Sequence, residues 1–211
     1  SGCGKSTTLR MIAGLEDITG GQLLINGQYA NDKGPREREV AMVFQSYALY
    51  PQMSVYDNLA FGLTLQGVDE DVIEERVQKT AKILGLTDYL DRLPRALSGG
   101  QRQAVTLLMA TLNKPKLLLL DEHTAALDPA TAEKVLELTK QIVRDNNITC
   151  LMITHNIPSA LSLGNKTIMM NNGSIVMELA GRERETMTTE KLLHKFHEQG
   201  MSNDRILFSA E

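Results

Sequence analysis

The chain has 211 residues, of which 42% are hydrophobic and 23% charged, and its formal net charge is −4. This composition suits a globular domain with a sizeable core and argues against a surface that neutralises many nucleic-acid phosphates. No run approaches the roughly 20 apolar residues of a membrane-spanning helix, and two distant cysteines, Cys3 and Cys150, suit reduced core positions better than a disulfide or a metal site.

The chain opens on most of a phosphate-binding loop, because residues 1–7 contain the last six positions of the pattern G-x-x-x-x-G-K-[ST]. Gly2 and Gly4 permit the φ angles of a backbone nest for an anion. Lys5 is placed to reach phosphates, Ser6 to offer a hydroxyl to Mg²⁺, and a helix over 6–13 to direct its positive end at them. A chance glycine-rich loop is the alternative for this motif alone. The candidate nucleotide-binding residues here are Ser1, Gly2, Cys3, Gly4, Lys5, Ser6 and Thr7.

Two strands are predicted next, over residues 21–28 with a turn at Asn26 and Gly27, and over residues 40–44. The charged residues 31–39 form a loop between them. From residue 46 to 112 the pattern becomes helical. One buried helix face is predicted from apolar residues at steps of three and four, namely Val72, Ile73, Val77, Ala81 and Leu84.

A second glycine-rich turn, Leu97-Ser98-Gly99-Gly100-Gln101, precedes a helix that we expect to end near residue 112. Ser98 is a natural N-cap, and the two glycines allow close approach to backbone N–H groups, which makes a second anion site. One nucleotide does not need two phosphate cradles from one chain. We therefore expect this turn to serve a nucleotide held by another copy or a partner.

Four leucines at 117–120 lead into Asp121 and Glu122, which is typical of a buried parallel strand that ends in two carboxylates. Ligands of open α/β sheets lie at the carboxyl ends of the strands. We expect Asp121 to hold Mg²⁺, usually through water, and Glu122 to polarise an attacking water. Two surface acids at a turn are the alternative interpretation.

The rest of the chain predicts a helix from Pro129 to about residue 144, a strand over 148–154 that ends before His155, a hairpin over 166–179, and a last helix over 189–198. The last helix buries Leu192, Leu193 and Phe196. Its two histidines, at 194 and 197, are expected to be solvated rather than to bind metal, since no third ligand is visible.

In this order the motifs strongly resemble the ATP-binding subunits of ABC transporters, over essentially the whole chain. They are a partial Walker A motif (Ser1 to Thr7), a Q-loop (Gln45), the LSGGQ signature (Leu97 to Gln101), Walker B (Leu117 to Asp121) with Glu122, a D-loop (Ala125 to Asp128) and the switch histidine His155. The LSGGQ turn in this context is highly specific.

The resemblance implies two such domains that sandwich two ATP molecules head to tail, with the Walker A motif of one domain facing the signature of the other. It implies that Gln45 senses the γ-phosphate and Mg²⁺ and links them to membrane subunits, that His155 contacts the γ-phosphate and that Asp128 communicates across the dimer. The implied nucleotide contacts of the partner's site are Ser98, Gly99, Gly100 and Gln101, and the implied metal contacts are Ser6, Gln45 and Asp121.

The two halves resemble different branches of the family. Residues 11–102 resemble the ATPases of maltose-type sugar importers. After Gln103 the chain resembles poorly characterised importer ATPases that work with lipoprotein binding proteins. It carries Ala104 and His123 where the sugar branch usually has arginine and proline. A chimera and a natural fragment are both open alternatives.

The expected fold is therefore an α/β P-loop NTPase domain of the ABC type, with a mostly parallel sheet and an inserted helical subdomain, truncated at its N-terminus. We expect one domain over residues 1–211, with a catalytic core (1–45 and 113–211) and a helical subdomain (46–112). Because the family's adenine-stacking aromatic residue lies upstream, this stretch alone should bind ATP poorly.

The resemblance implies an ATP-hydrolysing importer subunit at the cytoplasmic face of the membrane, with ATP and Mg²⁺ as ligands. The implied partners are a second nucleotide-binding domain, transmembrane permease subunits and an extracytoplasmic solute-binding protein, and no nucleic acid. Two alternatives stay open: a soluble ABC ATPase that does not act in transport, and a remnant that is not catalytic.

Overall fold

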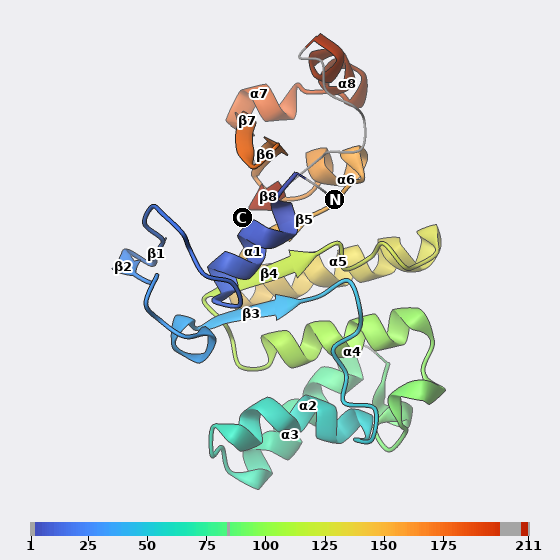
Figure 1. Ribbon diagram of the computed structural model, residues 1–211. Helices are drawn as coiled ribbons and strands as arrows, with labels where there is room; N and C mark the ends of the chain where they lie inside the picture. Colours follow the sequence, from blue (N-terminus) through green and yellow to red (C-terminus); the bar gives the residue numbers. More distant parts are fainter. Residues whose placement is uncertain (1–2, 84, 199–207, 211) are drawn as a thin grey trace. The chain divides into compact units, whose positions relative to one another are not determined.

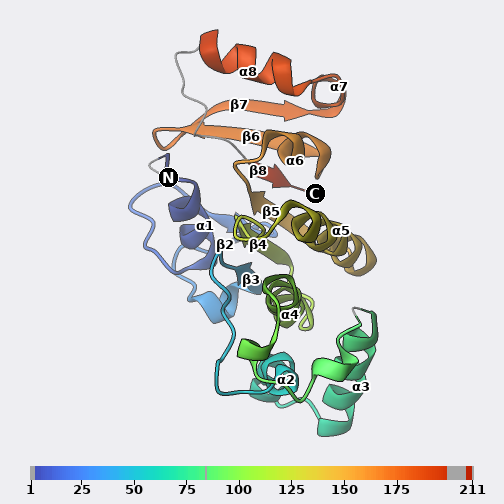
Figure 2. The same ribbon diagram turned by 90° about the vertical axis from the view of Figure 1, so that its right-hand side faces the viewer.

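The computed structural model describes residues 3–83, 85–198 and 208–210 (Figure 1 and Figure 2). Three residues with sequence predictions, Ser1, Gly2 and Leu84, lie outside the described residues. The chain divides into two compact units. The first comprises residues 1–42, 116–122 and 148–211, and the second residues 43–115 and 123–147.

The first unit carries a sheet, whose described strands have the order β3-β4-β5-β8-β6-β7. Their bounds are Val40–Val43 (β3), Leu117–Asp121 (β4), Thr149–Ile153 (β5), Lys166–Asn171 (β6), Ser174–Ala180 (β7) and Phe208–Ala210 (β8). β4 pairs in parallel with β5, and β8 is antiparallel to both β5 and β6. It follows that β4, β5 and β6 run in one direction, and the α/β class is confirmed.

Helix α1 (Lys5–Ala13) packs on this sheet through apolar side chains. Leu9 and Ala13 share a buried cluster with Leu119 of β4, Ile153 of β5 and Met170 of β6. The predicted helix after the phosphate loop is therefore present. It packs against β4, the strand whose carboxyl end carries the acidic residues.

A second cluster in the first unit joins α6 (Ile157–Ser162), the β6–β7 hairpin and α8 (Thr189–Glu198). Its buried members are Ala160, Met169, Leu179 and Leu192, and Figure 2 shows α8 alongside β7. The hairpin turns at Asn172 and Gly173, both with positive φ, as in the two-residue turns that match strand twist. The predictions of the hairpin, the last helix and the burial of Leu192 are confirmed; the side chain of Phe196 lies outside the described part.

The predicted strand over 21–28 is shorter than expected and continues as a hairpin. β1 (Leu24–Ile25) pairs antiparallel with β2 (Gln28–Tyr29) around a turn in which Asn26 and Gly27 have φ values of 51° and 74°. The predicted turn is correct. The return strand was missed because its two residues are too few to show a period.

The expected loop at 31–39 contains a short 3-10 helix, η1 (Pro35–Arg38). Arg38 is buried, and its Nη1 donates to the carbonyls of Met11 and Ile12 at 2.6 and 3.0 Å. These carbonyls belong to the last turn of α1, where a cation is favoured. The charged loop therefore closes the end of the helix that follows the phosphate loop.

The second unit is helical. Its helices are α2 (Val55–Leu65), α3 (Glu70–Ile83), α4 (Gly99–Thr111) and α5 (Pro129–Asn146). Two short 3-10 helices, η2 (Thr87–Tyr89) and η3 (Pro94–Ala96), lie between α3 and α4 in the chain. Ile73, Val77 and Ala81 are buried in its core, which confirms the predicted face of α3, whereas Val72 is only partly buried.

Both cysteines, Cys3 and Cys150, are buried. Among the described residues, helices long and apolar enough to cross a lipid bilayer are absent. A short helix, α7 (Gly181–Glu185), follows β7 and completes the described elements of the first unit.

Candidate nucleotide site

The phosphate loop passes into α1 through Gly4, which caps the helix with a φ of 88°. A residue with a side chain rarely adopts this angle, so glycine is required here. Lys5 is almost fully buried, and its Nζ donates to Cys3 Sγ at 2.9 Å. The lysine is thus folded back toward the loop in which an anion would bind.

The phosphate loop contacts the turn between β6 and β7. Gly173 donates its backbone N–H to the Cys3 carbonyl at 3.1 Å. A Cβ on Gly4 would lie 3.4 Å from the Cα of Gly173, which is ordinary van der Waals contact. The sequence predicted both the loop and the hairpin but contained no signal that they touch.

The loop also meets the end of β4. Ser6, in the first turn of α1, donates its hydroxyl to Asp121 Oδ1 at 3.0 Å. Burial raises the pKa of Asp121 above its ordinary value, and the hydrogen bond from Ser6 opposes that shift. A bound cation would favour the ionised carboxylate. The structure therefore brings together two of the three residues predicted to contact a metal.

Hydroxyl and carboxylate oxygens are the ligands that suit Mg²⁺, which keeps several waters and takes the rest from phosphates. In the described part of the chain, groups of three or more His, Cys, Asp or Glu side chains that could cage a metal are absent. The pair Ser6 and Asp121 fits Mg²⁺ held together with a nucleotide, rather than a metal held by protein alone.

The two predicted catalytic residues are also neighbours. Glu122 follows β4 with a φ of 48°, and its backbone N–H donates to the Ile153 carbonyl at 3.1 Å. His155 Nδ1 lies 3.3 Å from Glu122 Oε2. The exposed fraction is 60% for the His155 side chain and 21% for Glu122, so both are accessible to solvent. A carboxylate next to an imidazole at a strand edge can orient water and stabilise charge.

The signature turn begins α4 in the second unit. Ser98 Oγ accepts from the Gln101 N–H at 3.2 Å, and Gln101 Oε1 accepts from the Ser98 N–H at 2.9 Å. This reciprocal pair confirms Ser98 as the N-cap.

The two glycines after Ser98 are tightly packed. A Cβ on Gly99 would lie 3.1 Å from the Tyr47 hydroxyl, and one on Gly100 only 2.3 Å from Thr131 Cγ2 of α5. Gly100 is therefore required by helix packing, a reason that the sequence analysis missed. Its expected contact with a phosphate stays a prediction.

The remaining predicted residues also belong to the second unit. Gln45 is exposed at a bend just after β3. Asp128 is the N-cap of α5, and its Oδ1 accepts from the Thr131 N–H at 3.1 Å. Hydrogen bonding to the Thr131 side chain, and after it the bond from the Thr131 N–H, lowers the pKa of Asp128. A negative N-cap also suits the helix dipole, so Asp128 has a structural role in addition to the predicted one.

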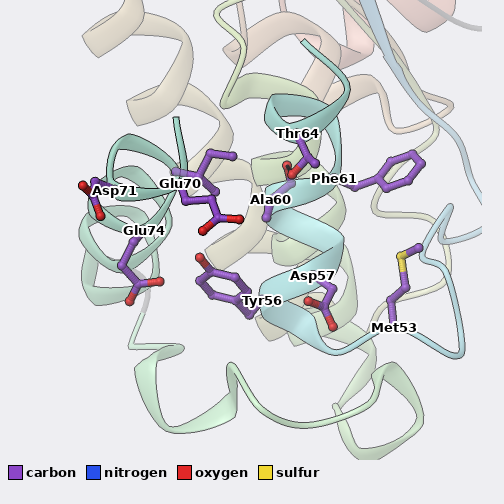
Figure 3. A pocket seen from close by; sticks show the side chains of 10 residues that line it. Met53, Tyr56, Asp57, Ala60, Phe61, Thr64, Glu70, Asp71 and Glu74 are labelled. Carbon is purple, nitrogen blue, oxygen red and sulfur yellow. Dashed lines mark hydrogen bonds between the residues drawn. The ribbon is translucent and has the colours of Figure 1, made fainter. Parts of the chain in front are cut away.

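A pocket of about 680 Å³ lies between α2 and α3 (Figure 3). Its polar lining is mostly acidic, and Tyr56 stands among the acids. The lining residues are Met53, Tyr56, Asp57, Ala60, Phe61, Thr64, Glu70, Asp71, Ile73 and Glu74. The hydrogen bond to Glu74, followed by burial, raises the pKa of Tyr56 to about 12.

The burial of His123, the residue that follows the two predicted acids, was not predicted from the sequence. His123 is only 3% exposed, and its Nε2 lies 3.2 Å from Thr139 Oγ1 of α5. Burial lowers the pKa of His123 to about 4, so the ring is neutral. The sequence offered no periodic signal for this burial, because His123 lies in a loop.

Comparison with known proteins agrees with this geometry. The model of the protein family described as "ABC transporter" matches residues 1–125. The multiple sugar-binding transport ATP-binding protein MsmK of Streptococcus mutans is 48% identical over 172 residues, 82% of this chain and 46% of that protein. The alpha-glucoside transport ATP-binding protein AglK of Rhizobium meliloti is 48% identical over 176 residues, 83% of this chain and 49% of that protein.

A third relative is the oligosaccharides import ATP-binding protein MsmX of Bacillus subtilis, which is 47% identical over 178 residues, 83% of this chain and 48% of that protein. The chain thus spans about half the length of the curated relatives it matches. Together with the phosphate loop, the acidic strand end and the capped signature turn, these matches establish that the chain belongs to the ABC transporter family.

Proposed function

We propose that this chain is the ATP-binding domain of an importer subunit that hydrolyses ATP to drive solute uptake through membrane partners. The observation that carries the proposal is the 3.0 Å hydrogen bond between Ser6 and Asp121, which joins the phosphate loop to the end of β4. The names of these three relatives favour a sugar or oligosaccharide as the solute.

In the proposed reaction, backbone N–H groups around Gly4 and the ammonium of Lys5 bind the phosphates of ATP. Ser6 and Asp121 would hold Mg²⁺, with Gln45 as a further contact to it. When bound, the metal would supply positive charge that offsets the negative charge of the phosphates.

Glu122 orients a water for in-line attack on the γ-phosphorus. As the new P–O bond forms, the bond from this phosphorus to the oxygen bridging to the β-phosphate breaks, and ADP leaves. His155, which is 3.3 Å from Glu122, stabilises charge on the γ-phosphoryl group in the transition state. This chemistry depends on placement and charge more than on covalent steps.

The second phosphate cradle, Ser98 to Gln101, belongs in this proposal to the nucleotide of a second ATP-binding domain, and Asp128 communicates between the two. The chain acts as one domain, with residues 1–45 and 113–211 as the catalytic core and 46–112 as the helical subdomain. Transmembrane permease subunits hold it at the cytoplasmic face of the membrane, and an extracytoplasmic solute-binding protein delivers the solute. Nucleic acid has no part in this function.

The test uses the full-length protein that contains this chain, purified with its permease. Glu122→Gln keeps the shape of the side chain but removes the charge that orients water. We expect ATP turnover to fall by about 100-fold or more, as for a lost acid–base group, while ATP binding is retained. Undiminished turnover in this variant would remove Glu122 from the proposed role. Uptake of labelled oligosaccharide by cells carrying the variant tests the transport part.

A further inference from the structure

The loop from Glu122 to Asp128 joins the end of β4 to the start of α5, and it carries two residues of the proposed function at its two ends. All residues of this loop are described. Within it, His123 alone is buried, whereas the alanines at 125 and 126 and Asp128 are exposed. A loop of small and exposed residues has few contacts to fix it. Two of its side chains are anchored, His123 by Thr139 and Asp128 by the Thr131 N–H, and His123 is the one adjacent to Glu122.

The hydrogen bond between His123 and Thr139 has a defined donor and acceptor. Thr139, itself buried in α5, donates its hydroxyl proton to the Val135 carbonyl at 2.7 Å. The hydroxyl has one proton, so toward His123 it can only accept. The imidazole must therefore carry a proton on Nε2 and donate it to Thr139 Oγ1 across 3.2 Å.

The residue before His123 has an unusual backbone. Glu122 has a φ of 48°, a left-handed conformation that residues with a side chain rarely adopt unless their surroundings impose it. On its N-terminal side Glu122 is fixed by the hydrogen bond from its N–H to the Ile153 carbonyl. On its C-terminal side the next fixed point is the His123 side chain.

We propose that His123 is a positioning residue for Glu122: its hydrogen bond to Thr139 holds the peptide that follows Glu122, and so restrains the Glu122 backbone from its C-terminal side. This inference rests on the proposed function of Glu122. The ring does not touch the reacting atoms in this account. It acts by limiting the directions that the neighbouring carboxylate can take, which matters because misplacement of a catalytic group lowers the rate steeply.

The test separates positioning from packing with isosteric pairs in the full-length protein. Thr139→Val removes the acceptor and keeps the shape, and Thr139→Ser keeps the acceptor. His123→Phe keeps a planar ring without the N–H donor, and His123→Gln restores an N–H at a similar reach. For each variant, kcat, the KM for ATP and the melting temperature are measured.

We expect Thr139→Val and His123→Phe each to lower kcat about tenfold, with a KM for ATP within about twofold of the parent. Thr139→Ser and His123→Gln should retain most of the parent kcat. The double variant His123→Phe/Thr139→Val should be no slower than the worse single variant, because both changes remove the same hydrogen bond.

Two results would overturn the inference. One is a Thr139→Val variant that melts at a lower temperature but turns over ATP at the parent rate. The other is equal kcat for His123→Phe and His123→Gln, because a role in packing alone does not depend on the donor. Glu122→Gln is assayed alongside. If it turns over normally, the proposed role of Glu122 has failed; if it is inactive while Thr139→Val is unaffected, only the present inference has failed.

Discussion

Ser6 Oγ donates a hydrogen bond to Asp121 Oδ1 at 3.0 Å, although the two residues are 115 positions apart in the chain. Both oxygens suit Mg²⁺, and the raised pKa of Asp121 reflects a buried carboxylate that a cation would stabilise. Substitutions in this pair are therefore the most direct test of whether ATP binding depends on Mg²⁺.

Asp121→Asn should weaken Mg²⁺-dependent ATP binding by about tenfold or more, because the amide keeps the shape but loses the charge that holds the cation. Titration of the full-length protein with a fluorescent ATP analogue, with and without Mg²⁺, measures this. Asp145→Asn, the same chemical change at an exposed position of α5, is the control. If both variants bind equally well in Mg²⁺, Asp121 is not a metal contact.

Gly100→Ala should destabilise the second unit by about 1–3 kcal/mol, the usual cost of overpacking, because the new Cβ would lie 2.3 Å from Thr131 Cγ2. Thermal and urea unfolding measure the change. Adding Thr131→Ser removes the methyl group in the way and should recover most of the loss. Gly20→Ala, where a Cβ meets nothing within 4 Å, is the matched control. A Gly100→Ala protein as stable as its parent would contradict the packing argument.

Gln103→Leu should stabilise the protein by about 1 kcal/mol. Gln103 is fully buried in α4, and neither its Oε1 nor its Nε2 has a hydrogen-bond partner among the described residues. A buried amide without partners loses its hydration without compensation, and an apolar side chain of similar volume removes this penalty. The midpoint of urea unfolding reports the gain. Gln78→Leu, at an exposed position of α3, should not stabilise; a loss of stability in Gln103→Leu would refute the prediction.

Tyr56 should ionise only at strongly alkaline pH, since the hydrogen bond to Glu74 and burial raise its pKa to about 12. A raised pKa means that the fold favours the neutral phenol. Its stabilising effect is present below pH 10 and is lost as the pH rises from about 10 to about 12. Alkaline titration followed at 295 nm should show a late component that Tyr56→Phe removes.

Glu74→Gln should move that component to lower pH, because the hydrogen bond to Glu74 is the largest cause of the shift. Tyr29→Phe, which removes an exposed tyrosine of β2, should leave the late component in place and serves as the control. A late component that survives Tyr56→Phe would assign it to another residue.

The elements that the sequence predicted well are those that depend on residues close together in the chain. Four consecutive leucines before Asp121 predicted β4 as a buried strand, and Ser98, a natural N-cap, predicted the start of α4. The last helix begins and ends where its pattern does, at Thr189 and Glu198. Each of these depends on neighbours within one or two turns of chain, which a single sequence displays directly.

The features that the sequence did not show depend on contacts between distant residues. The burial of His123 depends on Thr139 in the next helix, and the requirement for Gly100 depends on the position of Thr131. Order along the chain predicted that the residues of the phosphate loop and of the β4 edge would converge, through the rule for strand ends in α/β sheets. It did not predict which atoms would meet.

The hydrogen bond from Gly173 to the Cys3 carbonyl joins two main-chain atoms. No exchange of one amino acid for another deletes the acceptor, and only proline deletes the donor. Insertion or loss of a single residue in the β6–β7 turn would instead carry the donor away from the loop. Tolerance at this turn is thus limited in two ways: its residue count stays fixed, and positions 172 and 173 accept only residues that can take a positive φ.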